Sequence, residues 1–142
     1  MVREIIKGPA ILSQISTPID FATERDALAN LIQDLMDTAN ANKKNCAGLA
    51  AIQIGIPKKV ILVNEKGKFV PYINPTIVGR SRSTYCVEEG CLSLDGKRTV
   101  KRHHDIKVVW RNKNGKPCVK VFSGYVAEIL QHEIDHCNGI LI

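Results

Sequence analysis

The stretch that decides the fold is SGYVAEILQHEIDHC, residues 123–137 of a 142-residue sequence. Its pattern predicts one helix over this range, and Gly139 follows shortly after as a stop signal. His132 and His136 are four residues apart and therefore lie on one helical face. Two imidazoles at this spacing can bind one cation, while Glu133 stands beside the site as a proton carrier. The pattern is typical of a metal-dependent hydrolase; the alternative is a coincidental triplet on a polar helix face.

A catalytic zinc or iron site takes three protein ligands and keeps one position open for water, so two histidines need a third partner. Cys91 is the candidate, because Gly90 before it allows close approach of the backbone and a thiolate binds metals. A lone cysteine is more often a small buried apolar residue, and spacing alone leaves both interpretations of Cys91 open. The other four cysteines, at positions 46, 86, 118 and 137, fit the apolar interpretation.

The segments before the last helix predict an α+β fold with mostly antiparallel pairing. An earlier helix is expected from residues 23–26, which have the form of a capping box. Its apolar residues at helical spacing are Leu28, Leu31, Ile32, Leu35, Met36 and Ala39. Short β-type segments follow at residues 60–63, 72–74, 106–110 and 119–122, with turns at 64–68 and 112–115. Because no linker or repeat interrupts the chain, we expect a single domain over residues 1–142.

The composition describes an ordinary globular protein, with 44% hydrophobic residues and a net charge of +6. The longest apolar runs are far below the ~20 residues of a membrane span, and the N-terminal residues open no signal-peptide pattern. The five cysteines cannot all pair with one another and show no metal-finger spacing, which favours a reducing compartment. We therefore expect a soluble, cytoplasmic protein with no membrane partner.

The positive charge makes nucleic-acid binding an alternative function. Its best support is the basic segment at residues 96–104. However, aromatic residues make up only 5% of the chain, no helix-turn-helix or stacking signature is present, and a short basic strand is usually a solvated face. We expect no specific nucleic-acid recognition, whereas weak attraction to a polyanion such as the ribosome is compatible with the charge.

Three segments stand in a fixed order along the chain: AGLAAIQIG at residues 47–55, EGCLS at 89–93 and QHEIDH at 131–136. They resemble the three signature motifs of the peptide deformylases, and the similarity extends through residues 73–75 and 100–102 between the motifs. The resemblance implies a peptide deformylase-like fold, with antiparallel sheets around a central C-terminal metal-binding helix. It also implies an enzyme that removes the N-formyl group from the N-terminal formyl-methionine of newly made polypeptides.

By this resemblance the metal ligands are Cys91, His132 and His136, with a water or hydroxide in the fourth position. A divalent cation lowers the pKa of bound water, so the implied nucleophile is a metal-bound hydroxide, with Glu133 as general acid and base. One thiolate and two imidazoles suit several metals. Iron(II) is the implied metal in the cell, while zinc, nickel or cobalt are expected in purified protein.

The resemblance assigns stabilisation of the oxyanion to the side-chain amide of Gln53 and the backbone N–H of Leu92. Without the motif, Gln53 is better interpreted as a polar residue closing a β-edge. Glu89 is implied to pair with Arg102 and so to hold the Cys91 loop; a surface charge pair is the alternative. Asp135 either orients a ligand histidine or is solvated.

Substrate selectivity is implied to come from an apolar slot for the methionine side chain, with the substrate backbone added as a strand beside Gly48. The implied wall residues are Gly48, Leu92, Tyr125, Ile129 and His132. Two residues depart from the family pattern. Cys46 stands where a glycine usually opens the first motif, so its side chain is expected to affect the substrate strand. Glu128 stands where an apolar wall residue is common, and it either lines the slot or turns to solvent.

Three functions are compatible with these features, and the agreement of the ligand set with Glu133 and Gln53 favours a working deformylase. The alternatives are a deformylase-fold protein with altered specificity for N-blocked peptides, motivated by Cys46 and Glu128, and a non-catalytic metal-binding relative. The expected partner is a nascent formyl-Met polypeptide. Because the sequence ends six residues after His136, we do not expect ribosome docking through a C-terminal extension of the kind some relatives have.

Overall fold

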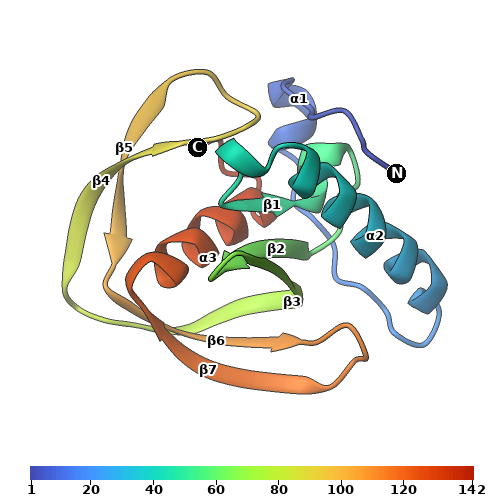
Figure 1. The fold of residues 1–142 in the computed structure, drawn as a ribbon. Coiled ribbons are helices and arrows are strands. Elements are labelled where there is room, and N and C mark those ends of the chain that lie inside the picture. Colours follow the sequence, from blue (N-terminus) through green and yellow to red (C-terminus); the bar gives the residue numbers. More distant parts are fainter.

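The computed structural model describes residues 1–142 and contains seven strands and three α-helices (Figure 1). The longer helices are α2 (Arg25–Ala41) and α3 (Gly124–Cys137), and α1 (Pro9–Leu12) is a single turn. The strands are β1 (Gly48–Ala50), β2 (Val60–Glu65), β3 (Lys68–Arg80), β4 (Thr84–Gly90), β5 (Lys97–His103), β6 (Asp105–Arg111) and β7 (Pro117–Ser123). Two 3₁₀ helices, η1 (Lys43–Asn45) and η2 (Ala51–Ile54), flank β1.

Five strands form one antiparallel sheet in the order β1-β2-β3-β6-β7, and β4 pairs with β5 in a separate hairpin. The β2–β3 turn consists of Lys66 and Gly67, whose φ angles are 54° and 88°. Two positive φ values match the right-handed twist of the flanking strands, and glycine adopts such a value without strain. β1 is an edge strand, so one side of its backbone is unpaired within the sheet.

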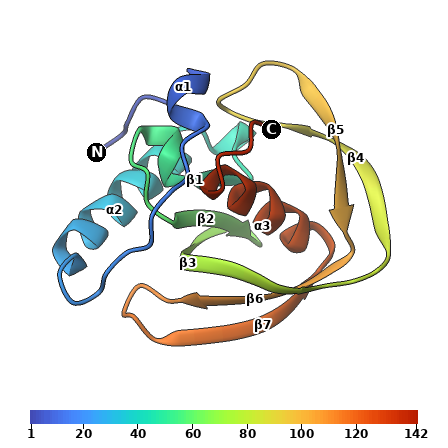
Figure 2. The ribbon, with the colours of Figure 1, turned by 180° about the vertical axis from the view of Figure 1, so that it is seen from behind.

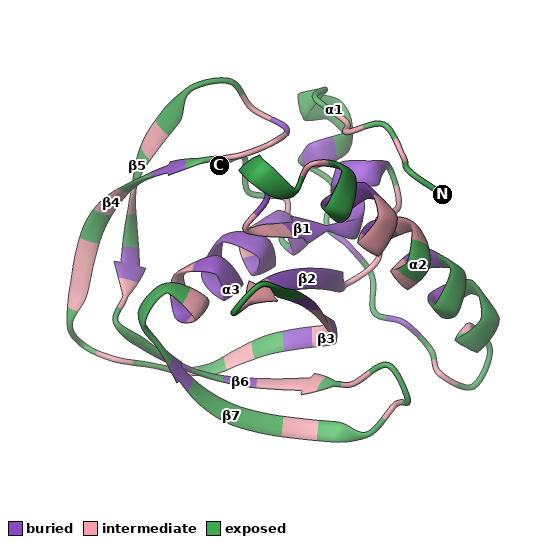
Figure 3. Cartoon of the chain, viewed as in Figure 1, coloured by how far each residue is buried: buried purple, intermediate pink, exposed green.

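Helices cover both faces of the five-stranded sheet. Val60 and Leu62 of β2 belong to a core that also contains Leu28 and Leu35 of α2. Ile61 and Val63 alternate with them and belong to a second core, which contains Ile129, Leu130 and Ile134 of α3. A strand that is buried on both faces is apolar at successive positions, which explains the continuous run in β2 (Figure 3).

Helix α3 lies between the five-stranded sheet and the β4–β5 hairpin (Figures 1 and 2). It ends as the sequence predicts: Gly139 has φ +74°, and its N–H donates to the carbonyl of His136 at 3.1 Å. A Cβ on Gly139 would lie 2.4 Å from the carbonyl oxygen of Ser13, so this position requires glycine. The predicted α+β fold, with antiparallel sheets around the C-terminal helix, is confirmed.

The details of two predicted segments differ from the structure. The capping box at residues 23–26 is wrong, because α2 begins at Arg25 and its N-cap Glu24 makes no side-chain cap. The Glu24 carboxylate instead accepts the Asp20 N–H at 2.7 Å and pairs with Lys58. Strands β1 and β4 were absent from the predicted strands, and β3 is much longer than residues 72–74. None of the helices is long and apolar enough to cross a membrane.

Candidate metal centre and substrate pocket

One helical turn separates His132 from His136 on the buried face of α3, and their Nε2 atoms lie 3.2 Å apart. Cys91 follows the end of β4, and its Sγ lies 3.4 Å from Nε2 of His136. The three ligand atoms all lie within 4.8 Å of one another. The fold thus brings together the three side chains that the sequence analysis named as metal ligands.

These distances suit one metal ion. Metal–nitrogen bonds of about 2.0–2.1 Å and a metal–sulfur bond of about 2.3 Å, at tetrahedral angles, place neighbouring ligand atoms about 3.3–3.6 Å apart. The nitrogen–nitrogen and sulfur–nitrogen distances at His136 are close to this range. One thiol and two imidazoles also form a donor set that binds zinc and iron. The residues present therefore fit a divalent metal.

Hydrogen bonding orients the ring of His132. Its Nδ1–H donates to the Glu89 carboxylate at 2.8 Å, which leaves Nε2 directed at His136. Burial lowers the pKa of His132, but contacts with Cys91 and Glu89 outweigh it and raise the pKa to about 10. Burial and the neighbouring His132 lower the pKa of His136 to about 3.

A buried ion pair supports this arrangement. Arg102 donates to both carboxylate oxygens of Glu89, at 2.9 and 2.6 Å, and a third bond of 2.6 Å reaches Asp135. Arg102 is 4% exposed and Glu89 8% exposed, so the pair is not a surface charge pair. Burial raises the pKa of Glu89, but Arg102 and His132 lower it more, to about 2. Asp135 therefore neither orients a ligand histidine nor is merely solvated, because it anchors Arg102.

Glu133 lies beside the histidines and is 4% exposed. Its Oε1 atom has no hydrogen-bond partner. Burial is the main reason that the pKa of Glu133 rises to about 7. A buried carboxyl with a pKa near neutrality is poised both to accept and to donate a proton.

Gln53 is 2% exposed and lies in η2, directly after the edge strand β1, to which it hydrogen-bonds as the β-edge interpretation expects. Its Oε1 accepts the Ala50 N–H at 2.9 Å, and its Nε2 donates to Ser93 at 3.1 Å and lies 3.4 Å from the sulfur of Cys91. The amide donor of Gln53 is therefore at the metal centre. The backbone N–H of Leu92, next to Cys91, donates to no protein acceptor.

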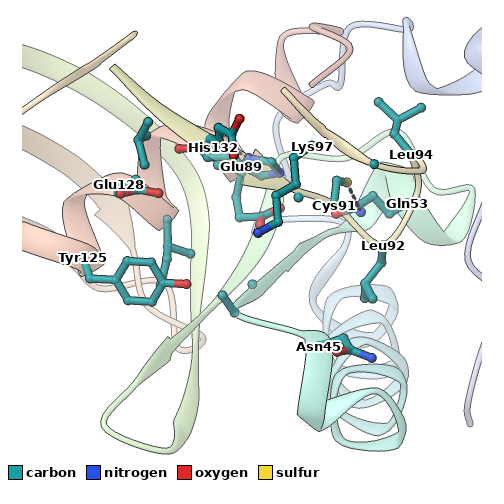
Figure 4. A pocket seen from close by; sticks show the side chains of 18 of the residues that line it. Asn45, Gln53, Glu89, Cys91, Leu92, Leu94, Lys97, Tyr125, Glu128 and His132 are labelled. Carbon is teal, nitrogen blue, oxygen red and sulfur yellow. Dashed lines mark hydrogen bonds and ion pairs between the residues drawn. The ribbon is translucent and has the colours of Figure 1, made fainter. Parts of the chain in front are cut away.

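The centre opens into a cavity of about 740 Å³ (Figure 4). This volume lies in the usual range for sites that bind small molecules. The predicted catalytic and substrate-binding residues that line it are Gly48, Gln53, Leu92, Tyr125, Glu128, Ile129, His132 and Glu133. Figure 4 shows Glu128 and Tyr125 together on the α3 side of the cavity, apart from Cys91 and Gln53.

A family model described as polypeptide deformylase matches residues 2–142. The chain belongs to the peptide deformylase family. A peptide deformylase of Clostridium beijerinckii is 40% identical over 142 residues, which is 100% of both chains. The Met-Ala-Ser-bound structure of the class I type b peptide deformylase from Acinetobacter baumannii has a TM-score of 0.91 at 32% identity and covers 99% of this chain and 97% of that chain. A probable peptide deformylase from Synechococcus phage S-SSM7 has a TM-score of 0.89 at 34% identity, with coverage of 99% and 97%.

The match to the peptide deformylase family confirms both the family and the function that the three motifs predicted. Peptide deformylases are metal-dependent hydrolases, and they act on formyl-Met nascent peptides. The Cys91, His132 and His136 group is consistent with that metal dependence. The chain is therefore an enzyme that deformylates N-formyl-Met peptides.

The two departures from the deformylase pattern have different positions. Cys46 does not line the cavity, contrary to its predicted substrate-binding role, because its side chain is 4% exposed and packs in the core beside α2. Its Sγ lies 3.3 Å from the carbonyl oxygen of Gly48. Glu128 does line the cavity, and its Oε1 accepts the hydroxyl of Tyr85 at 3.2 Å. Burial and, after it, the neighbouring Glu89 carboxyl raise the pKa of Glu128.

Sequence reasoning missed two residues of this deformylase site. Ser93 is 2% exposed, accepts the Gln53 amide and donates its backbone N–H toward the sulfur of Cys91 at 3.4 Å. Its place at the end of the EGCLS motif was an available signal. Tyr85 holds Glu128 across 43 positions of sequence, and no local pattern indicates such a contact.

Gly48 is required for close packing at the deformylase centre. A Cβ there would lie 2.8 Å from Oε2 of Glu133, from Cγ2 of Ile129 and from the carbonyl oxygen of Leu62. We expect Gly48→Ala to lower the free energy of unfolding by about 1–3 kcal/mol, as overpacking does, and to reduce kcat by displacing Glu133. Urea denaturation and formate release measure the two effects.

The matched control for Gly48→Ala is Gly8→Ala, because a Cβ on Gly8 meets no atom within 4 Å. The control should retain the wild-type urea midpoint and kcat. Equal stability and activity in the two variants would contradict the close approach at Gly48.

Proposed function

We propose that residues 1–142 act as one catalytic domain, in which a metal held by Cys91, His132 and His136 and a proton carrier, Glu133, remove the formyl group from formyl-Met polypeptides. The observation that carries this assignment is the convergence of one thiol and two imidazoles beside a buried carboxyl at the wall of a cavity. Three of these side chains would hold the metal and the fourth would move the proton, and metal-assisted hydrolysis of an amide needs both tasks.

A divalent metal supplies Lewis acidity, and it lowers the pKa of water so that a hydroxide nucleophile exists near neutral pH. We assign iron(II) as the metal in the cell, on the basis of the family resemblance. Zinc, nickel and cobalt also suit the thiol and imidazole donors and are expected in purified protein. The Glu89 and Arg102 pair supports the ligands by fixing the Nδ1–H of His132, which keeps its Nε2 available.

Glu133 takes the proton of the attacking water as a bond forms between the water oxygen and the formyl carbon. The carbonyl oxygen of the formyl group then carries negative charge, and we assign its stabilisation to hydrogen bonds from the Leu92 N–H and the Gln53 amide. The bond from carbon to the methionine nitrogen breaks next, and Glu133 returns its proton to that nitrogen. The products are a peptide with a free amino group and formic acid, which keeps the second proton of the water and ionises to formate near neutral pH. The pKa of about 7 at Glu133 suits both proton transfers.

The substrate backbone is proposed to pair with β1. This strand ends the five-stranded sheet, and Gly48 lies both on it and at the cavity wall. An extended peptide can add to such an edge through main-chain hydrogen bonds that do not depend on its sequence. Leu92, Tyr125 and Ile129 then provide apolar contacts for the first side chain.

The cellular setting is also a proposal. All five cysteines are free, which favours a reducing compartment and so the cytoplasm. The net charge of +6 supports weak attraction to the ribosome, without specific recognition of nucleic acid and without a membrane partner.

The decisive experiment measures formate release from formyl-Met-Ala-Ser by anaerobically prepared, iron-loaded protein. N-acetyl-Met-Ala-Ser and unmodified Met-Ala-Ser serve as comparison peptides. We expect turnover of the formyl peptide alone, its loss after chelation and its return on adding iron(II). Metal uptake without formate release, in folded protein, would overturn the catalytic assignment.

A further inference from the structure

Glu128 lines the cavity and has no part in the proposed reaction. It precedes His132 by four residues on α3, so it stands about 6 Å along the helix from that ligand at 1.5 Å per residue. The first side chain of a substrate begins two bonds from the formyl carbon. Six bonds therefore join the formyl carbon to the last of four side-chain atoms, and at about 1.2 Å of advance per bond an extended side chain ends about 7 Å from the reacting carbon. Glu128 is placed near the end of the slot that this side chain enters.

The carboxyl group of Glu128 is held at the cavity by Tyr85. The Tyr85 hydroxyl donates to it at 3.2 Å, and this is its only hydrogen-bond donor in the protein. The nearby Glu89 carboxylate, in contrast, is saturated by Arg102 and His132. Glu128 is half-buried and forms no ion pair, so a cation or an N–H donor at the end of the slot would find an acceptor there.

Charges along the cavity favour a cation over an anion. Its acidic lining residues without a basic partner are Glu88, Asp95, Glu128 and Glu133, because Glu89 is paired with Arg102. Lys97 is the one lysine or arginine in the lining, and it is exposed and forms no ion pair. An entirely apolar slot excludes a charged side chain because burying an unpaired charge is costly. A carboxyl at the end of the slot removes much of that cost by supplying a partner.

We propose that Glu128 determines the specificity of the first side-chain slot, so that this enzyme also accepts N-formyl peptides whose first side chain ends in a cation or an N–H donor. The inference rests on the proposed function, because it concerns the same site and the same reaction. Glu128 acts here on substrate choice and not on the chemical step.

The test compares two isosteric substrates, formyl-norleucyl-Ala-Ser and formyl-ornithyl-Ala-Ser, which differ only in a terminal methyl or ammonium group. The readout is the ratio of kcat/KM for the ornithine peptide to that for the norleucine peptide, at matched metal content. In Glu128→Leu we expect this ratio to fall by about tenfold or more, because the ammonium loses its partner. In Glu128→Gln, which keeps the shape but removes the charge, we expect a fall of about threefold or more.

Glu88→Gln is the matched control, because it removes one carboxylate from the same cavity lining at a residue that forms no hydrogen bond with Tyr85. Its ratio should stay within about twofold of wild type. Equal falls in Glu88→Gln and Glu128→Gln would show a general charge effect and overturn the inference. An unchanged ratio in Glu128→Leu, with a lower melting temperature, would also overturn it and leave Glu128 as a structural tie between β4 and α3.

Binding provides a readout that does not need turnover. Calorimetry of the two peptides with zinc-loaded Glu133→Gln protein, with and without Glu128→Leu, should show the ornithine preference falling in the same direction. If wild type releases no formate from formyl-Met or formyl-norleucine peptides, the proposed function fails. The ratio of the two peptide affinities from calorimetry still tests the role of Glu128 in that case. If wild type turns over normally, and Glu128→Leu changes neither the kcat/KM ratio nor the affinity ratio of the two peptides, only the inference about Glu128 fails.

Discussion

Replacement of Glu133 by alanine is expected to lower kcat for formyl-Met-Ala-Ser by about 10²- to 10⁴-fold, the usual contribution of a positioned acid–base group. The physical reason is the loss of the only buried carboxyl beside the histidines that has an oxygen without a partner. Formate release by protein with a measured metal content tests this result.

Two features of the Glu133 experiment separate chemistry from structure. Glu133→Gln retains the shape of the side chain but cannot take a proton, so its kcat should fall nearly as far as that of the alanine variant. Metal content should stay at the wild-type level in both variants, because Glu133 is not among the three converging ligand atoms. Activity within about tenfold of wild type in Glu133→Gln would show that another group carries the proton.

Replacement of His136 by alanine should remove the metal and, with it, turnover. His136 is fully buried, and its Nε2 is the atom that lies close to both other ligands, at 3.2 Å from His132 and 3.4 Å from Cys91. Loss of a group that only orients a ligand typically lowers metal affinity about 10- to 100-fold, and loss of a ligand should exceed this. Metal analysis after gel filtration, together with formate release, measures both effects.

The control for His136→Ala is His104→Ala. His104 is exposed and contacts the ring of Tyr85, with centroids 4.8 Å apart, but it is absent from the cavity lining. This variant should retain its metal. Full metal occupancy in His136→Ala would mean that the centre uses a different set of ligands.

Local patterns in the sequence were sufficient for the C-terminal helix, because its capping glycine and the spacing of His132 and His136 both follow from helical geometry. The apolar run at residues 60–63 also gave a correct strand, β2. The resemblance to the deformylase motifs decided for Cys91 as a ligand, which spacing had left open, and supplied Gln53 and Leu92, which no periodicity links to α3. The structure adds that all three lie at one cavity with the histidines.

Other features lie beyond the reach of local patterns, because they depend on which segments meet in space. Strand β4 has polar residues on both faces, and its only strand partner is β5, so it lacks the alternation that marks a half-buried strand. The bond between Arg102 and Asp135 and the bond between Tyr85 and Glu128 join residues that are 33 and 43 positions apart. Cys46 was assigned to the substrate side because it stands where a glycine usually opens the first motif, whereas its side chain packs in the core.

The position of β2 between two cores has a consequence for motion. Its alternate side chains belong to different cores, so separation of either α2 or α3 from the sheet exposes apolar side chains of β2. Amide hydrogens of residues 60–63 should therefore exchange with solvent only when the whole protein opens. None of the residues of α2 lines the cavity. By packing on β2, this helix still contributes to the rigidity of the sheet behind the reacting groups.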